Sequence, residues 1–202
     1  DAWYCTSLFL EHARLQGLIV TGGAVDIYKC FDQIDRWLLT CILLKAGFNK
    51  KVLSAYNRFH QDLRVYNSLA GGIGKPYTRR CFIPQGCPFS LCFIAWLLRP
   101  WILMARAAGC VPRILADDLL LIYVDPLLAK FVEVFDNTHK VLIDMGARVA
   151  PNKPYNFSTC PTFREWLSGH TWPLLEKLLM PANISETWAH ILVLLLVLSA
   201  PP

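Results

Sequence analysis

Leu115-Ala116-Asp117-Asp118 is the stretch that decides the fold of this chain, because two adjacent carboxylates stand between two apolar runs. Residues 111–115 lead into the acid pair and residues 119–124 lead out of it, and both runs have the composition of strands. The acids therefore occupy the turn of a predicted β-hairpin. Paired acids at a hairpin tip suit a metal site, although an Asp-Asp pair by itself is more often a solvated turn.

Three other segments accompany the acid pair. An apolar approach ends in Asp26, with the aromatic Phe31 five residues further on, and a turn-forming stretch, Ile83-Pro84-Gln85-Gly86-Cys87-Pro88-Phe89-Ser90, leads into a long apolar run. Asn152-Lys153-Pro154 follows the hairpin. In this order the segments resemble the palm of a reverse transcriptase of the type carried by non-LTR retrotransposons and group II introns. The resemblance covers residues 18–158 and implies an α+β fold.

The resemblance implies a metal site made of carboxylates. It makes Asp26 and Asp117 the principal ligands, with Asp118 as a third ligand or a close partner. Nucleotide transfer to a 3′ end needs an activated hydroxyl and a neutralised pyrophosphate, and two divalent ions about 3.5–4 Å apart supply both. Magnesium binds few protein carboxylates and keeps several waters, so two or three Asp residues suffice. We expect two Mg²⁺ ions, for which Mn²⁺ could substitute.

The resemblance also assigns nucleotide-binding roles. Phe31 matches the aromatic that blocks a ribose 2′-hydroxyl, Gln85 and Gly86 match a loop beside the incoming nucleotide and template, and Lys153 matches a lysine near the triphosphate. From the residues alone, Gln85 and Gly86 also fit an ordinary turn, and Lys153 also fits a surface lysine.

Two other acids stand where a strand gives way to a helix. Asp32 and Asp35 could be mistaken for a second catalytic pair, but this position favours capping and interaction with the helix dipole.

Basic charge is concentrated in one region. Residues 36–116 contain twelve Lys and Arg residues against Asp62 alone, whereas the net charge of the whole chain is +5. Such a region suits a duplex phosphate backbone. We expect nucleic-acid contacts from Arg64, Lys75, Arg79 and Arg80, and we expect an RNA template, a DNA primer and deoxynucleoside triphosphates as partners.

Composition fits a folded domain. The chain has 202 residues, of which 54% are hydrophobic, enough for one domain or for one domain with part of another. The eight cysteines include no C-x-x-C pair and fall mostly in apolar segments, which predicts buried thiols. No signal-like leader opens the sequence, so we expect an intracellular protein, nuclear if it comes from a eukaryotic retrotransposon.

Periodicity predicts the order of elements. We expect a strand at 18–27 that is interrupted by Gly22-Gly23, helices at 36–46 and 50–60, and a hairpin over 64–81 that turns at 71–74. A buried helix over 88–108 should kink or break at Pro100, and its Arg99 and Arg106 argue against a membrane span. An amphipathic helix is expected at 126–145, with short strands at 148–150 and 155–157.

The two ends depart from the resemblance. Residues 1–17 are expected to be a truncated remnant of the fingers, so the chain looks like a fragment, and residues 159–202 are an uncertain segment without the expected Leu-Gly hairpin. Codons for Ser185-Glu186-Thr187-Trp188-Ala189-His190, shifted by one base, can read Arg-Asp-Leu-Gly-Ala-His. We therefore hypothesise that residues after about 185 are translated out of frame.

Three alternatives to an active reverse transcriptase stay open at this point. A viral RNA-dependent RNA polymerase would normally show Gly-Asp-Asp, which the chain lacks. A catalytically inactive retroelement remnant would at most bind nucleic acid. A structural protein with a coincidental acid pair would show no metal-dependent protection from unfolding.

Overall fold

The chain forms two compact units, which we describe separately. The computed structural model describes residues 2–84, 86–150, 153–173 and 177–178. Unit 1 takes its described residues from 1–28 and 100–202, and unit 2 comprises 29–99. The division arises because the chain leaves the sheet of unit 1 after its first strand, forms unit 2 with residues 29–99 and then returns to unit 1.

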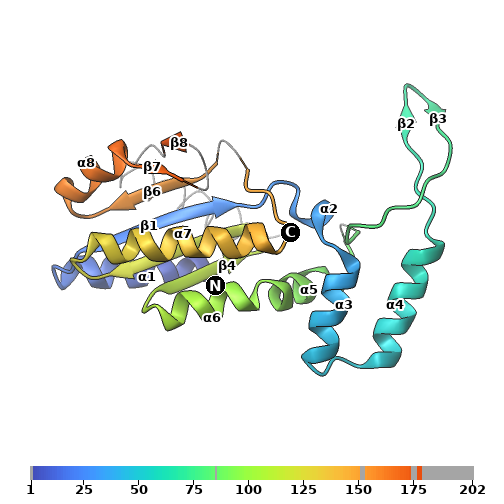
Figure 1. The fold of residues 1–202 in the computed structure, drawn as a ribbon, viewed down its shortest axis with the longest axis horizontal. Helices are drawn as coiled ribbons and strands as arrows, with labels where there is room; N and C mark the ends of the chain where they lie inside the picture. Colours follow the sequence, from blue (N-terminus) through green and yellow to red (C-terminus); the bar gives the residue numbers. More distant parts are fainter. Residues whose placement is uncertain (1, 85, 151–152, 174–176, 179–202) are drawn as a thin grey trace. The chain divides into compact units, whose positions relative to one another are not determined.

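Unit 1 is built on a four-stranded antiparallel sheet (Figure 1). The strands lie in the order β4 (Val111–Leu115), β5 (Asp118–Val124), β1 (Val20–Asp26) and β6 (Tyr155–Ser158). The predicted strands at 18–27 and 155–157 and the predicted hairpin are thus confirmed as secondary structure. The hairpin turn is Ala116-Asp117, however, and Asp118 is already the first residue of β5 because it pairs with Leu115. The segment 148–150 is not a strand: it makes one isolated bridge, between Val149 and Ile27. A short pair, β7 (Thr171–Trp172) and β8 (Lys177–Leu178), completes the described strands of this unit.

Helix α1 (Ala2–Leu15) covers one face of the sheet. Its Leu10 and Ala13 pack against every second residue of the strands, including Val20, Ile122 and Phe157. The alternation follows from the period of two in a strand, which sends successive side chains to opposite faces. Residues 2–15 therefore belong to the core of unit 1.

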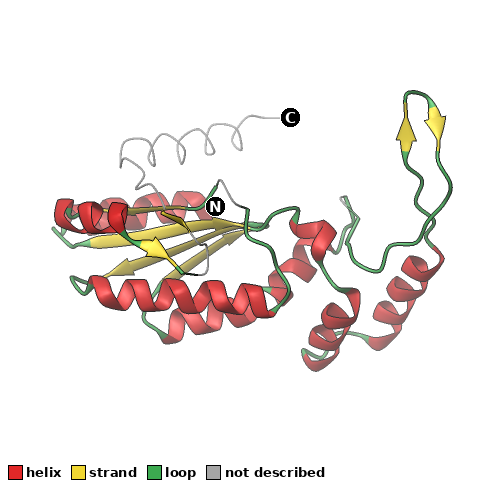
Figure 2. Ribbon diagram, turned by 45° about the horizontal axis from the view of Figure 1, so that its top comes forward, coloured by secondary structure: helices red, strands yellow, loops and turns green. Residues whose placement is uncertain are grey.

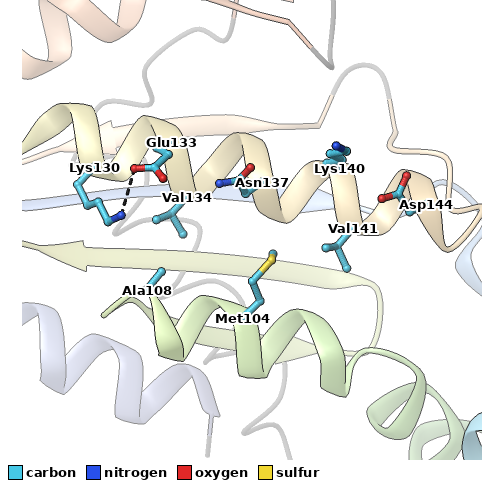
Figure 3. A pocket seen from close by; sticks show the side chains of 9 residues that line it. All are labelled: Met104, Ala108, Lys130, Glu133, Val134, Asn137, Lys140, Val141 and Asp144. Atoms are coloured by element: carbon cyan, nitrogen blue, oxygen red, sulfur yellow. Dashed lines mark hydrogen bonds and ion pairs between the residues drawn. The ribbon is translucent and has the colours of Figure 1, made fainter.

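The opposite face carries α7 (Leu128–Asp144), the amphipathic helix predicted at 126–145 (Figure 2). Its Phe131, Phe135 and Leu142 are fully buried. Helix α6 (Arg99–Ala107) lies beside α7, and a groove of about 230 Å³ runs between them, with Met104 and Ala108 on one side (Figure 3). Helix α8 (Pro161–Gly169) follows β6 and packs against it.

Two adjacent glycines in β1 have a packing reason. Gly22 lies opposite Phe157 of β6, and a Cβ added at Gly22 would come within 2.3 Å of that ring. A Cβ at Gly23, on the other face, would come within 2.3 Å of Phe135 of α7. Each face of the central strand thus makes room for one aromatic ring, so the Gly-Gly pair does not interrupt the strand.

Unit 2 consists of helices and one hairpin. The described helices are α2 (Cys30–Gln33), α3 (Arg36–Lys45), α4 (Lys50–Asp62) and α5 (Ser90–Leu97), so both helices predicted at 36–46 and 50–60 are confirmed. Aromatic rings hold them together: the Tyr56 and Phe93 centroids lie 5.0 Å apart and the Phe48 and Phe93 centroids 5.7 Å apart. The hairpin joins β2 (Ser68–Leu69) to β3 (Gly72–Ile73), with its turn at Ala70-Gly71 rather than at 71–74.

Two predictions about the apolar segments need correction. The break expected at Pro100 falls at Leu98, because proline is accepted within the first turn of the new helix α6. Only two cysteines, Cys30 and Cys110, are fully buried, while Cys5 and Cys92 are exposed.

Within the described residues no single helix is long and apolar enough to cross a membrane. Only α5 and α6 taken together, across a bend, meet the length and composition that a span requires.

Candidate active site

The three expected acids meet at one end of the sheet of unit 1. In the register of β1 and β5, Asp26 lies directly opposite Asp118, the last rung of that ladder. Asp117 occupies the turn before Asp118, and its carbonyl oxygen accepts a hydrogen bond from the backbone N–H of Ile27 at 3.2 Å. Strand pairing therefore brings together Asp26 and Asp118, which lie 92 positions apart in the sequence.

The strand alternation explains which way two of these acids face. On β5 the residues that share the α1 face are Val124, Ile122, Leu120 and then Asp118, and on β1 they are Val20, Gly22, Ala24 and then Asp26. On both strands this face is apolar up to the last pair of the ladder, where it becomes acidic at Asp26 and Asp118. The apolar part anchors the strands, and the acidic part ends the sheet with two facing carboxylates.

The turn between β4 and β5 is backbone-strained. Ala116 has φ of 56°, in the left-handed region where a Cβ is unfavourable. A positive φ at the first turn residue is typical of a type II′ hairpin, which normally takes glycine there. Such strain often accompanies functional sites, since the surrounding structure must hold it in place.

Asp26 is a buried carboxylate with one cationic partner. Only 6% of the residue is exposed, and its carboxylate forms an ion pair with the ammonium of Lys153, whose side chain is largely exposed. The backbone helps to fix this geometry, because the N–H of Ala150 donates to the Asp26 carbonyl oxygen at 2.8 Å. The structure thus brings Lys153 to the acid cluster, and its expected role beside a triphosphate stays a prediction.

The cluster has more negative than positive charge. Burial raises the pKa of Asp118, and the charges of Asp117 and Asp26 raise it further, while Lys153 opposes them. The pKa of Lys153 is raised in turn, first by its hydrogen bond with Asp26. Three carboxylates and one ammonium leave a surplus of anionic oxygen, which is the donor type that hard divalent cations require.

The carboxylates do not form a ready-made metal cage. In the described part of the chain no three His, Cys, Asp or Glu side chains are grouped so that they could hold an ion together. Their oxygen chemistry nevertheless fits magnesium, which takes few protein ligands and completes its shell with water and substrate phosphate.

One member of the cluster was not expected from the sequence. Tyr155, on β6, lies opposite Ala24 of β1, and its pKa is raised by burial and by the charge of Asp118. Its place follows from the β1–β6 register, for which the local sequence carries no signal.

The other expected nucleotide-binding residues belong to unit 2. Phe31 is half-buried in α2, and its carbonyl oxygen accepts from the backbone N–H of Ile83 at 2.9 Å. That bond ties the aromatic segment to the Pro84–Gly86 loop. Gly86 is exposed with φ of 85°, a conformation that favours glycine, and Gln85 lies outside the described residues.

The four basic residues singled out from the sequence differ in their surroundings. Arg64, Lys75 and Arg80 are exposed. Arg79 is less free to contact a phosphate, because its guanidinium pairs with Asp32 at 2.9 Å and lies 5.2 Å from the centroid of the Phe82 ring. This pair ties the end of the hairpin segment to α2.

The two acids assigned to helix ends have structural roles. The Asp35 side chain accepts from the backbone N–H of Leu38 at 2.9 Å and caps α3, which confirms the capping prediction. Asp32 lies in the first turn of α2 and pairs with Arg79. The sequence pattern indicated the helix end but not this partner.

Comparisons with known proteins identify the fold. No protein-family model and no curated protein matches the chain. Among solved structures, telomerase from Candida tropicalis in complex with the TWJ fragment of telomeric RNA matches at a TM-score of 0.55 and 15% identity, over 71% of this chain and 26% of the telomerase chain. Apo telomerase from the same species, truncated from its C-terminal domain, matches at a TM-score of 0.58 and 13% identity, over 78% of this chain and 34% of that chain.

The chain has a reverse-transcriptase-like fold. It spans about a quarter to a third of the telomerase chains that it matches. At this identity the likeness concerns the fold, and it does not single out the retrotransposon and intron enzymes to which the motifs point.

Proposed function

We propose that this chain is the palm of an RNA-directed DNA polymerase of a retroelement, which transfers nucleotides onto a primer 3′-hydroxyl. The observation that carries the proposal is the β1–β5 register, which places Asp26 opposite Asp118 and beside Asp117. These are the three acids that the sequence motifs select, and they come from segments that no local pattern brings together.

In this proposal the acids hold two Mg²⁺ ions, or Mn²⁺ in their place. Asp26 and Asp117 are the principal ligands and Asp118 is the third ligand or their close partner. Bound there, the ions would lower the pKa of the primer hydroxyl and neutralise the leaving pyrophosphate. The surplus of carboxylate over ammonium supports this donor set.

The chain's own side chains position the reactants. Lys153, paired with Asp26, has a long exposed stem and is placed to exchange that partner for a triphosphate oxygen. Phe31 would exclude a ribose 2′-hydroxyl, and Gln85 and Gly86 would line the template side of the nucleotide. These roles come from the motif resemblance, and the hydrogen bond from Ile83 to Phe31 supports a common setting for Phe31 and the segment that begins at Ile83.

The proposed partners are an RNA template, a DNA primer and deoxynucleoside triphosphates. Unit 2 holds eleven Lys and Arg residues against three Asp residues, and Arg64, Lys75 and Arg80 are exposed. Contacts with phosphates make binding weaken steeply as salt rises. Telomerase, which shares the fold, was solved with RNA.

Primer extension on an RNA template tests the proposal. We expect Asp117→Asn to abolish extension, because the amide removes a charge from the metal-binding set but keeps the size of the side chain. Asp62→Asn, at the exposed end of α4, is the matched control and should leave extension unchanged. An Asp117→Asn variant that extends primers as well as the unaltered chain would refute the proposal.

Metal-dependent stability separates the alternatives. Ligands that bind only the folded state stabilise it by about 2.7 kcal/mol at a hundredfold excess over the dissociation constant. A polymerase palm or an inactive remnant with intact acids should gain Tm with Mg²⁺, and Asp117→Asn should lose that gain. Stabilisation and duplex binding without extension would indicate an inactive nucleic-acid-binding remnant, and no stabilisation would indicate a structural protein.

A further inference from the structure

The hairpin of unit 2 is a two-stranded ribbon. Backbone hydrogen bonds link Val65 and Tyr77 in both directions at 2.9 Å, and Gly74 donates to the Asn67 carbonyl oxygen at 2.8 Å. At the tip, Ala70 and Gly71 both have positive φ, 48° and 82°, which is the pattern of a type I′ turn. In Figures 1 and 2 the ribbon projects beyond the end of α4. Two-stranded hairpins with no packed face are marginally stable in water.

The tip of this ribbon is apolar and uncovered. Leu69 is 86% exposed, more than any other large apolar side chain in the described residues, and Ile73 is 75% exposed. Leu69 pairs with Gly72 and Ile73 pairs with Ser68 on the next rung, so the two side chains lie on opposite faces of the ribbon. The tip is therefore apolar on both sides.

The arms behind the tip are basic. Residues 63–81 include Arg64, Lys75, Arg79 and Arg80 and contain no Asp or Glu. Arg79 is held by Asp32 where the ribbon rejoins the helices, and the other three are exposed. An apolar tip followed by cationic arms complements a nucleic-acid duplex, in which stacked bases lie between two rows of phosphates.

We propose that this hairpin is a wedge for double-stranded nucleic acid. Leu69 and Ile73 press on a base step from the minor groove, and Arg64, Lys75 and Arg80 hold the flanking phosphates. The proposal rests on the proposed function in that the duplex is the RNA–DNA hybrid of template and primer. Such hybrids have A-form geometry, and the wide, shallow minor groove of an A-form helix admits a ribbon tip. Apolar side chains that enter a minor groove partly unstack the base step they contact.

The test uses the full chain and a 16-base-pair RNA–DNA hybrid with 2-aminopurine in its DNA strand. Fluorescence of this base rises when it unstacks, and anisotropy of a labelled hybrid gives the dissociation constant. The tip variant is Leu69→Thr with Ile73→Thr, which keeps the strand preference of both positions and removes the apolar ends. The control is Leu91→Gln, an exposed leucine on α5 of the same unit.

We expect the unaltered chain and Leu91→Gln to raise the fluorescence and the tip variant to leave it unchanged. Full burial of one Leu or Ile is worth roughly ten- to a hundredfold in a binding constant, so the tip variant should bind at least ~tenfold more weakly. Its dependence on salt should not change. By contrast, Arg80→Gln should keep the fluorescence rise and lower the slope of log K against log salt by about 0.7–0.9.

Two results would overturn the wedge: no fluorescence rise with the unaltered chain bound, or an equal rise with the tip variant. Both measurements are made in EDTA without nucleotides, so they do not depend on Asp26, Asp117 or Asp118. An unstacking signal without primer extension would therefore support the wedge and count against the polymerase. Primer extension without an unstacking signal would support the polymerase and count against the wedge.

Discussion

Gly23 offers a test of how the central strand is packed. A methyl group at this position would lie 2.3 Å from Cε2, 2.8 Å from Cζ and 3.0 Å from Cδ2 of Phe135, so the ring would have to retreat by about 1 Å to reach ordinary contact. Phe135 is 1% exposed, and the rings of His139 and Trp172 stand 4.3 Å and 4.6 Å from it. The ring has little room to move away.

The expected cost of Gly23→Ala follows from this confinement. Overpacking a filled core costs about 1–3 kcal/mol, while replacing glycine in a strand gains about 0.5–1 kcal/mol. The net change should be a loss of about 1–2 kcal/mol in the free energy of unfolding, measured by urea denaturation with tryptophan fluorescence as the probe. For a chain of this size that corresponds to a fall in Tm of roughly 2–8 °C.

Two companion variants make the reasoning refutable. Gly169→Ala, at the end of α8, meets nothing within 4 Å and has no positive φ, so it should change stability by less than about 0.5 kcal/mol. Phe135→Leu should reduce the penalty of Gly23→Ala when the two are combined, with a coupling of about 0.5–3 kcal/mol. A Gly23→Ala variant as stable as the unaltered chain, or additive with Phe135→Leu, would contradict the packing argument.

Three further predictions concern a histidine, a lysine and an aromatic residue. Burial lowers the pKa of His139 to about 4, so the folded state holds this side chain neutral, and its contribution to stability is complete above pH 6.5. As the pH falls to 5, the unaltered chain should lose roughly 2 kcal/mol of unfolding free energy that His139→Gln does not lose. Urea titrations at each pH measure this difference. Equal losses of unfolding free energy in both proteins would refute the assignment of this pH dependence to His139. Lys153→Met leaves the buried Asp26 carboxylate without its cation, so this variant should melt at a lower temperature in EDTA than the unaltered chain and should gain more Tm from Mg²⁺. An unchanged response to Mg²⁺ would count against a site shared by Lys153 and the metal. Replacing Phe31 with valine should admit ribonucleotides in primer extension, and unchanged sugar selectivity would remove it from the nucleotide site.

The sequence by itself determined the elements whose signals are local. The Asp117-Asp118 hairpin, the helices at 36–46 and 50–60, the amphipathic helix at 126–145 and the Asp35 cap all follow from short-range periodicity, turn chemistry or capping. Hydrophobic alternation also fixes which strand residues share a face, since a strand has a period of two.

Only the tertiary structure decided which of these elements meet. Three features depend on pairings between segments up to 131 residues apart, which leave no local trace in the sequence: the register that sets Asp26 against Asp118, the ion pair of Lys153, and the position of Tyr155. The Gly22-Gly23 pair reads as a strand break until Phe157 and Phe135 are seen to fill the space on its two faces. Likewise, the sequence places Leu69 in a strand and Ile73 in the turn of the predicted hairpin, but it does not show that both side chains are exposed, because exposure depends on what packs nearby.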